Sequence, residues 1–396
     1  MILRLALAAL VVASCIAAPP VVEAPPESPL AVATPTATPS PSPSPPPDPM
    51  AVSLLDFLAI RDAAQRSGDP ARVLDLLDPR APVEFREREL ALARIAAQRN
   101  VPAPRRTLVR YSGGLGAADG PLQRVEVLET DEQGRTRQIR YFFSHAGRTV
   151  LTEPVLDSLG PAETRSTEQV EIRFRQIDRL QARVAEPFVI EAIASLVARL
   201  GDDYRLRRPL SITLAPTTVA GLPPVASGFV NDGQITLLSS HSMVVDEGPG
   251  AEWARMVVTH EVAHILLFQR GTGPFVLLEG IPLWLTDDRR QRELDRLVAE
   301  DALWDLAHLV EGPRDTSEFF AGYAQASSFV RYLAATHGDR PVIAAWEAGR
   351  RARFDEAFRS AFGVDPTDAH AAWLRSLTPR GWKNRAAASR SASCLG

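Results

Sequence analysis

The chain has 396 residues but only two cysteines, a single lysine and no long hydrophobic run. Cys15 and Cys394 are too few for a disulfide scaffold or for a metal site made of cysteines alone. Arginine supplies nearly all of the basic charge, yet acidic residues outnumber it and the net charge is −4. Because nucleic-acid binding needs a basic face, we expect no nucleic acid partner. A transmembrane helix needs about 18 or more consecutive apolar residues, and no stretch beyond the N-terminus approaches that length.

The N-terminus has the pattern of a bacterial export signal. Arg4 precedes the apolar run 5–13, which is too short to span a bilayer but suits the hydrophobic part of a signal peptide. The motif VASC at 12–15 resembles the lipobox of bacterial lipoproteins, whose cysteine is lipidated and becomes the new N-terminus. We therefore predict a signal peptide over 1–14, lipidation of Cys15, and anchoring to the extracytoplasmic face of the cell membrane. An ordinary signal peptide with a nearby cysteine is the alternative.

A proline-rich segment precedes the first region of globular composition. Of the 33 prolines, 13 fall within 19–50, where aromatic residues are absent. Such a segment buries too little apolar area to offset the entropy lost on ordering, so 15–50 is predicted to be an extended spacer that begins with the lipidated cysteine. A proline-rich ligand for a partner protein is the alternative. The tail, 379–396, is expected to be disordered.

Residues 51–160 are predicted to form a small α+β domain. Three amphipathic helix patterns come first, and four runs of alternating apolar and polar residues follow, separated by turns that contain glycine. Helices followed by an antiparallel meander make a two-layer arrangement. This order is similar to the nuclear-transport-factor-2-like roll often found beside secreted enzymes. The predicted helices begin near 54, 72 and 87, and the predicted strands cover 106–111, 122–128, 138–143 and 149–153.

Residues 165–378 are predicted to form a second α+β domain. An Asn-Asp-Gly turn at 231–233 predicts a β-hairpin. From Gly250 to about Leu377 the apolar spacing is helical, so strands come first and helices follow. The predicted strands cover 170–174, 210–214, 228–230 and 234–238, and a long helix covers 178–200 and ends at Gly201.

One motif in this second region carries chemistry. The run from His260 to His264 is an H-E-x-x-H sequence, and on a helix its two histidines lie one turn apart on the same face. Two such imidazoles can bind one metal ion, and Glu261 can reach a water on that ion. Zinc suits this set because it accepts nitrogen and oxygen ligands and keeps an open position in catalytic sites. The helix is otherwise apolar, and burying these polar groups is costly unless they are coordinated; a packed helix with hydrogen-bonded histidines is the alternative.

A third protein ligand is needed, and Glu279 in the L-x-E-G run 277–280 is the main candidate. Here the chain resembles gluzincin metallopeptidases, and more closely the peptidase MA-like domains of secreted bacterial proteins. In those families a W-L-x-E-G run supplies the third zinc ligand; Val276 stands where tryptophan is usual. The resemblance implies one Zn²⁺ per chain, held by His260, His264 and Glu279. From the residues alone, three other side chains compete with Glu279: Glu252, Asp287 and Asp288.

The resemblance continues into FFAGYAQASSFVRYL at 319–333, which is similar to a tyrosine-containing helix of these peptidases and of related zinc aminopeptidases. In the aminopeptidases that tyrosine donates a hydrogen bond to the oxyanion, and Tyr323 is the matching residue. A purely structural aromatic residue is the alternative. The implied catalytic residues are therefore Glu261, as general base towards water activated by zinc, and Tyr323. The implied fold is thermolysin-like, with a small sheet followed by a mostly helical half.

The expected activity is that of a membrane-tethered, extracytoplasmic zinc metallopeptidase acting on a peptide or protein substrate. Strand 234–238 is expected at the sheet edge, where an extended peptide could add as a strand, and nearby His241 could touch it. No aminopeptidase-like G-x-M-E-N run is found, which favours internal cleavage. Two alternatives remain: a zinc amidase acting on cell-wall material, and a non-catalytic surface lipoprotein with a structural or degenerate metal site. Three further histidines are expected on helix surfaces or ends: His308, His337 and His370.

Overall fold

The computed structural model contains two α+β regions, each built on one sheet, which confirms the predicted mixed α+β class. The described residues are 49–100, 102–112, 122–130, 136–145, 148–154, 159–215, 228–231, 233–238, 251–315 and 318–377. The predictions for the signal peptide, Cys15, most of the proline-rich segment, His241 and the C-terminal tail lie outside these residues. Among the helices that are described, none is both long and apolar enough to cross a membrane.

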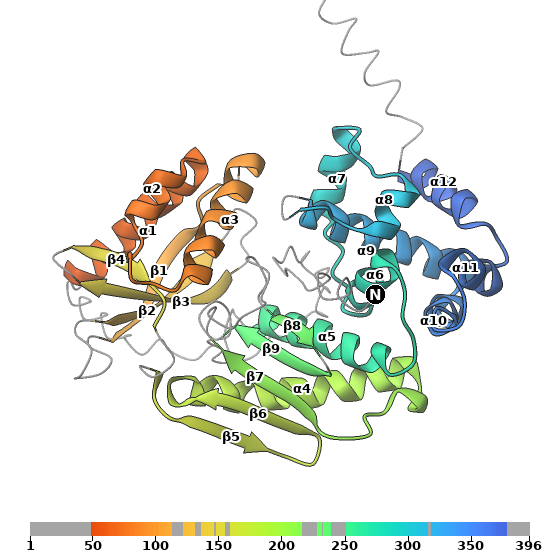
Figure 1. Ribbon diagram of the computed structural model, residues 1–396, viewed down its shortest axis with the longest axis horizontal. Coiled ribbons are helices and arrows are strands. Elements are labelled where there is room, and N and C mark those ends of the chain that lie inside the picture. The colour runs from red at the N-terminus through yellow and green to blue at the C-terminus, as the bar shows by residue number, and fades with distance from the viewer. Residues whose placement is uncertain are drawn as a thin grey trace, which may run out of the picture.

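The N-terminal region packs three helices against a four-stranded antiparallel sheet (Figure 1). The helices are α1 (Pro49–Ser67), α2 (Pro70–Asp75) and α3 (Val83–Arg99), and the strands are β1 (Arg105–Ser112), β2 (Gln123–Thr130), β3 (Thr136–His145) and β4 (Thr149–Thr152). The strand order β1-β2-β3-β4 is the predicted meander. Its buried face carries Val125, Val127 and Phe143, which pack with Leu54 and Leu58 of α1.

The second region begins with a five-stranded mixed sheet. Its strands are β5 (Ala162–Ser166), β6 (Val170–Arg175), β7 (Leu210–Ala215), β8 (Gly228–Asn231) and β9 (Gln234–Leu238); the long helix is α4 (Arg179–Leu200), and short 3₁₀ segments cover Gln176–Asp178 and Asp202–Tyr204. α4 connects the parallel strands β6 and β7 and ends at Gly201, as predicted. The apolar pattern does not predict β5, because its sequence AETRS is almost entirely polar and mostly exposed.

The expectation that strand 234–238 forms the sheet edge is wrong. The order of the sheet is β5-β6-β7-β9-β8, so β9 is paired on both sides. It runs parallel to β7 and antiparallel to β8, its partner in the predicted hairpin. The hairpin turn is local, but which of its two strands joins the larger sheet depends on residues far away in the sequence. The edge strand on this side is therefore β8.

From Ala251 to Leu377 the described residues are mostly helical, as predicted. The helices are α5 (Ala251–Phe268), α6 (Phe275–Leu285), α7 (Gln291–Ala299), α8 (Leu306–Glu311), α9 (Phe319–His337), α10 (Asp339–Ala348), α11 (Phe354–Phe362) and α12 (Pro366–Leu377). α5 packs on α4 and on α6, and α6 packs closely along α9. A Cβ atom on Gly280 would lie 2.6 Å from the carbonyl oxygen of Ala326, so this close approach of α6 and α9 requires glycine.

The histidines outside the motif take two different environments. His308 of α8 is partly exposed, as predicted; it stacks on Trp304 and lies 3.2 Å from Glu318. His370, by contrast, is buried against Phe329 and Trp373, so its predicted surface position is wrong. The tertiary packing of α12 on α9, which no local pattern reports, covers this ring.

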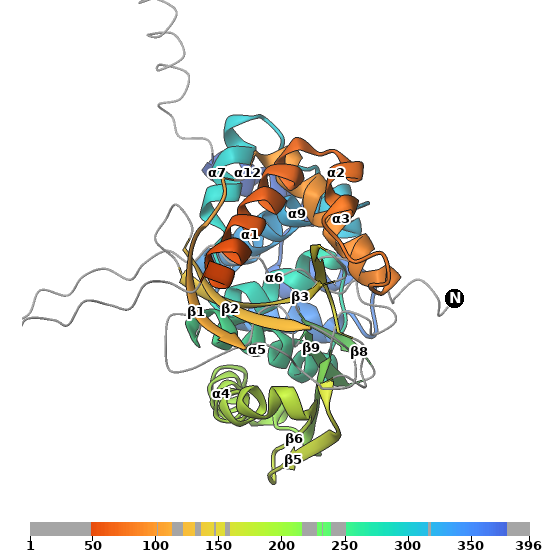
Figure 2. The same cartoon turned by 90° about the vertical axis from the view of Figure 1, so that its left-hand side faces the viewer.

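The two regions are joined by charged contacts and by a small apolar cluster. Arg140 of β3 donates a hydrogen bond to Asp178 at 2.6 Å, and both side chains are buried. At a second contact, α3 lies beside α9 (Figure 2), where Ile95 packs with Phe320. There the guanidinium of Arg99 lies over the Phe320 ring and pairs with a carboxylate of α7. The N-terminal region is thus held against the helices that follow the H-E-x-x-H motif.

Candidate metal centre

The two histidines of the motif lie on one face of α5, as their spacing predicts. His260 Nε2 is 3.1 Å from His264 Nε2, and both side chains are almost fully buried. α5 is apolar along this stretch because Val257, Val258 and Val262 belong to the core of the region. The helix therefore holds two ring nitrogens together inside the protein.

Glu279 of α6 joins the two histidines. Its Oε2 atom is 3.5 Å from Nε2 of His260 and 3.5 Å from Nε2 of His264. The ligand atoms of the three side chains all lie within 4.8 Å of one another, and all three residues are buried. The close packing of α6 on α9 brings Glu279, fifteen residues after His264, to this position.

The competing carboxylates do not join this cluster. Asp287 is mostly exposed and pairs with Arg331 at 2.7 Å. Asp288 is buried but accepts a hydrogen bond from Arg290 at 3.1 Å. The side chain of Glu252 lies outside the described residues. Among the candidates whose side chains are described, Glu279 alone lies with the two histidines.

The geometry of these three residues fits a zinc ion. A tetrahedral Zn²⁺ about 2.0–2.1 Å from each ligand separates the ligand atoms by about 3.3–3.4 Å, close to the 3.1 and 3.5 Å found here. Both oxygens of Glu279 are buried and accept no hydrogen bond among the described residues. A buried carboxylate without donors is costly, and a cation is the partner that such a site lacks.

The protonation states also suit metal binding. Burial by itself would raise the pKa of the Glu279 carboxyl, but the two imidazoles outweigh it and lower that pKa to about 2. Burial lowers the pKa of His260, which keeps its ring neutral at physiological pH. Metal ligands must be deprotonated, so both residues are ready to coordinate at neutral pH.

Glu261 lies next to the cluster without being part of it. Its side chain is fully buried, and neither of its oxygens has a hydrogen-bond partner among the described residues. Burial, followed by the charge of Glu279, raises the pKa of Glu261 well above its usual range. A Cβ atom on Gly228 would lie 3.1 Å from Glu261 Oε1, so the edge strand β8 passes directly beside this carboxylate.

Tyr323 of α9 lies close to Glu279. The residue is fully buried, its ring packs against Phe275 and Phe319, and its hydroxyl has no hydrogen-bond partner among the described residues. Burial, and then the charge of Glu279, raises the pKa of the Tyr323 hydroxyl well above its usual range. The hydroxyl stays protonated and is available to donate a hydrogen bond.

Arg290 also belongs to this neighbourhood, and the sequence pattern does not indicate it. Its guanidinium carbon lies 5.0 Å from the centre of the Tyr323 ring, and the residue is 2% exposed. In the sequence it belongs to the charged run Asp287–Arg290, which is typical of a solvent-exposed loop. Arg290 adopts φ = 45°, a left-handed conformation at the start of α7, and this bend turns the side chain inwards. No local signal distinguishes it from Arg289, which is exposed.

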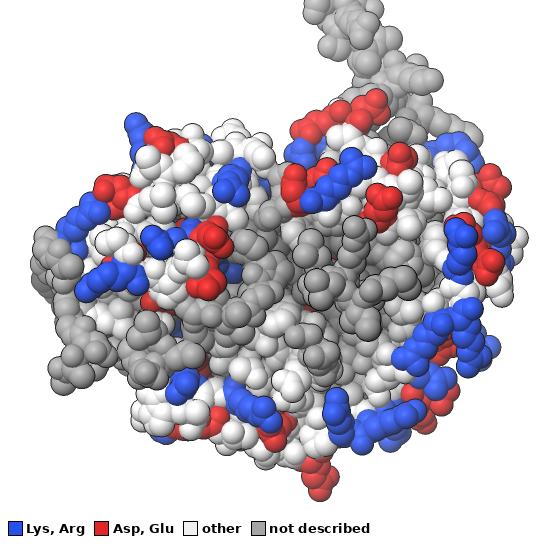
Figure 3. Space-filling view, in the orientation of Figure 1, with Lys and Arg blue, Asp and Glu red and all other residues white. Residues whose placement is uncertain are grey.

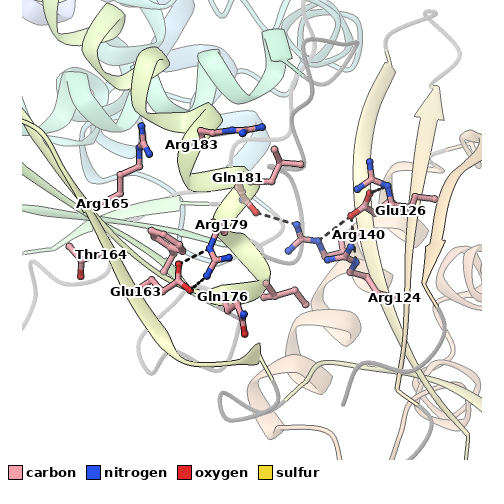
Figure 4. Close-up of a pocket in the computed structure, with 14 residues that line it drawn as sticks. Arg124, Glu126, Arg140, Glu163, Thr164, Arg165, Gln176, Arg179, Gln181 and Arg183 are labelled. Atoms are coloured by element: carbon pink, nitrogen blue, oxygen red, sulfur yellow. Dashed lines mark hydrogen bonds and ion pairs between the residues drawn. The ribbon is translucent and has the colours of Figure 1, made fainter. Parts of the chain in front are cut away.

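A cavity of about 600 Å³ lies between the two regions and away from the metal ligands. Figure 4 shows side chains of β2 and β3 facing those of β5 and α4 across it. Several of its arginines are paired, as Arg140 is with Asp178 and Arg179 with Glu163. None of the metal-cluster residues lines it, so this cavity is a feature of the junction between the regions.

Charged side chains of both signs lie on the surface formed by the described residues. On the face shown in Figure 3, acidic and basic side chains are interspersed, and no continuous basic surface is formed by the described residues there. This distribution follows the small negative net charge of the chain.

Comparison with protein-family models and curated proteins does not assign a function to this site. The chain matches no protein-family model and no curated protein sequence. The inference of function therefore depends on the geometry and chemistry described above.

Proposed function

We propose that this protein is a zinc-dependent peptidase of the gluzincin type. The observation that carries the proposal is the buried cluster of His260, His264 and Glu279, with the unpaired carboxylate of Glu261 directly beside it. A structural metal site needs the three ligands but has no use for Glu261. A buried carboxylate next to a metal position is the arrangement required for proton transfer during hydrolysis.

Each side chain has a defined task in this mechanism. Zn²⁺ bound to the cluster would polarise the scissile carbonyl and lower the pKa of the attacking water. Glu261 takes the proton from that water and later donates it to the leaving amine. Tyr323 donates its hydroxyl hydrogen bond to the oxyanion that develops on the carbonyl. Its packing against Phe275 and Phe319 keeps the hydroxyl in place.

The substrate in this proposal is an extended peptide held at β8. Among the described strands, β8 pairs only with β9, which leaves its outer edge for an added strand. Gly228 of β8 lies against Glu261, so a peptide along this edge passes beside the general base. In the same proposal, the first region is a nuclear-transport-factor-2-like roll, and the second is a thermolysin-like peptidase MA-like domain.

The proposal includes a lipid anchor on Cys15, outside the described residues. Acylation there would place the enzyme on the extracytoplasmic face of the membrane. Growth with labelled palmitate should label the wild-type chain and leave the Cys15→Ser variant unlabelled. Equal labelling of both chains, or of neither, would contradict the anchor without affecting the metal site.

The first test is to measure bound zinc and peptide cleavage together. We expect one zinc per chain in the purified protein and none in the His264→Ala variant, which loses one of its three ligands. Glu261→Gln should keep the zinc but lose at least about 1,000-fold in kcat, because it removes proton transfer. His308→Ala is the matched control, since His308 contacts Trp304 and Glu318 and is not one of the three clustered residues. A wild-type protein without zinc after growth in ample metal would refute the proposal and favour a tethered binding protein.

A further inference from the structure

Arg290 has an unusual combination of burial and unused hydrogen-bonding capacity. The residue is 2% exposed, yet neither Nη1 nor Nη2 has a hydrogen-bond partner among the described residues. Its only hydrogen bond to a described side chain runs from Nε to Asp288 Oδ2, at 3.1 Å. The other oxygen of Asp288 is also unpaired. Several guanidinium N–H groups are therefore buried with nothing to donate to.

Arg61, another buried arginine of this chain, has a carboxylate partner for its fork, which shows that the fold can pair such a group when its role is structural. It donates from Nε and Nη2 to the two oxygens of Glu89, at 2.8 and 3.0 Å. A buried guanidinium with unpaired N–H groups lowers the stability of the fold. A ligand that accepts hydrogen bonds from these groups would remove this cost.

The unpaired atoms lie at the proposed active site. The guanidinium lies over the Tyr323 ring, with 5.0 Å between its carbon and the ring centre. Nη1 and Nη2 remain without a hydrogen-bond partner among the described residues. Burial has the largest effect on the pKa of both Tyr323 and His260. The charge of Arg290 lowers both pKa values, as expected for a cation close to both groups.

We propose that Arg290 binds a carboxylate group of the substrate and so selects peptides that carry one near the scissile bond. A carboxylate matches the planar fork of Nη1 and Nη2 with two parallel hydrogen bonds, whereas Asp288 is bonded only to Nε. A peptide carbonyl has a single oxygen and does not match this fork. The inference rests on the proposed peptidase function and deepens it. The carboxylate can come from a free C-terminus or from an Asp or Glu side chain.

A cleavage experiment separates these sources. The probes are octapeptide libraries with free or amidated C-termini, each made with and without Asp and Glu. We expect Arg290→Gln to raise KM about 10- to 100-fold for the preferred carboxylate-bearing library and to raise KM much less for the carboxylate-free library. Arg290→Lys, which keeps the charge but loses the fork, should fall between. Arg289→Gln is the matched control, because Arg289 is exposed and paired with Asp287.

Binding to the metal-free protein tests the inference without turnover. After removal of metal by a chelator, calorimetry should show tighter binding of the carboxylate-bearing library by wild type and Arg289→Gln than by Arg290→Gln. If wild type cleaves both kinds of library equally and Arg290→Gln changes neither KM nor binding, the role of Arg290 in carboxylate binding is wrong, but the peptidase function is supported. If nothing is cleaved but binding depends on Arg290, carboxylate binding is supported and the peptidase function is wrong. Should Arg290→Gln fail to fold, Arg290→Lys decides in the same assays.

Discussion

Tyr323 is fully buried, and yet its hydroxyl has no hydrogen-bond partner among the described residues. A buried, unpaired hydroxyl lowers stability, and phenylalanine would fill the same space without that cost. The aromatic contacts with Phe275 and Phe319 do not require the oxygen. Packing alone therefore does not explain tyrosine at this position. The hydroxyl lies close to Glu279, and in the proposed mechanism it donates to the reacting carbonyl.

We therefore predict that Tyr323→Phe separates stability from activity. The variant should be as stable as wild type or more stable by about 1 kcal/mol, because the unpaired hydroxyl is removed. Its kcat should fall about 100-fold, with KM and zinc content unchanged, because the oxyanion loses one donor. Urea unfolding, steady-state kinetics and metal analysis measure the three quantities. Tyr332→Phe, on the same helix, is the control; equal kcat in Tyr323→Phe and wild type would give Tyr323 a purely structural role.

At the scale of the helix, the position of Glu279 depends on how closely α6 approaches α9. A Cβ atom on Gly280 would lie 2.5 Å from Val330 Cγ2 and 2.6 Å from the carbonyl oxygen of Ala326. Gly280→Ala must push the two helices apart, and Glu279 precedes this residue. We expect the variant to lose about 1–3 kcal/mol of stability and to bind zinc more weakly, which titration against a chromogenic chelator would show. Unchanged zinc affinity would mean that helix spacing does not position the ligand.

Asp78 ties the helical layer of the first region to its sheet. Its carboxylate accepts hydrogen bonds from Arg80 and from Ser144 of β3. These contacts, that with Arg80 above all, outweigh the opposing effect of burial and lower its pKa to about 2. Because the folded pKa is lower than the unfolded one, the charged form stabilises the fold above about pH 4 and that contribution is lost as the pH falls towards 2.

We predict that Asp78→Asn destabilises the first region by about 2 kcal/mol at neutral pH. The difference between variant and wild type should shrink as the pH falls from about 4 to 2, since protonation removes the same interaction. Urea unfolding followed by far-ultraviolet circular dichroism at several pH values measures it. A difference that stays constant over this range would show that the charge of Asp78 is not responsible.

At the scale of the whole molecule, the buried pair of Arg140 and Asp178 connects the two regions. Removing one member of such a pair leaves a buried charge, whereas replacing both by apolar residues is far less costly. We expect Asp178→Asn to destabilise the protein by about 3 kcal/mol, and Arg140→Met combined with Asp178→Leu to recover much of that loss.

Two spectroscopic signals separate the regions in this experiment. All six tryptophans lie beyond residue 250, so their fluorescence reports the second region, while circular dichroism reports both. Loss of the pair should shift the two transitions apart. The matched control is Asp75→Asn, because its pair with Arg148 is exposed and should change stability by less than about 0.5 kcal/mol. Coincident transitions in Asp178→Asn would mean that this pair does not couple the regions.

Features that depend on neighbours a few residues apart could be predicted from the amino-acid sequence. The two histidines share a face because four residues make about one helical turn. The long helix at Arg179–Leu200, the hairpin around 231–233 and the meander of the first region follow from apolar periodicity and turn residues in the same way. The mixed α+β class follows from the order of these elements.

Contacts between residues far apart in the chain could not be predicted from the sequence and are known from the packing of the helices and strands. This packing selected Glu279 over Asp287 and Asp288, because α6 packs on α5 and α9 while the following loop points two carboxylates elsewhere. It placed β8 rather than β9 at the sheet edge, and it buried Arg290 beside Tyr323. Such placements depend on contacts between elements far apart in the chain. Local periodicity reports only which face of an element is apolar, so it carries no information on what that face meets.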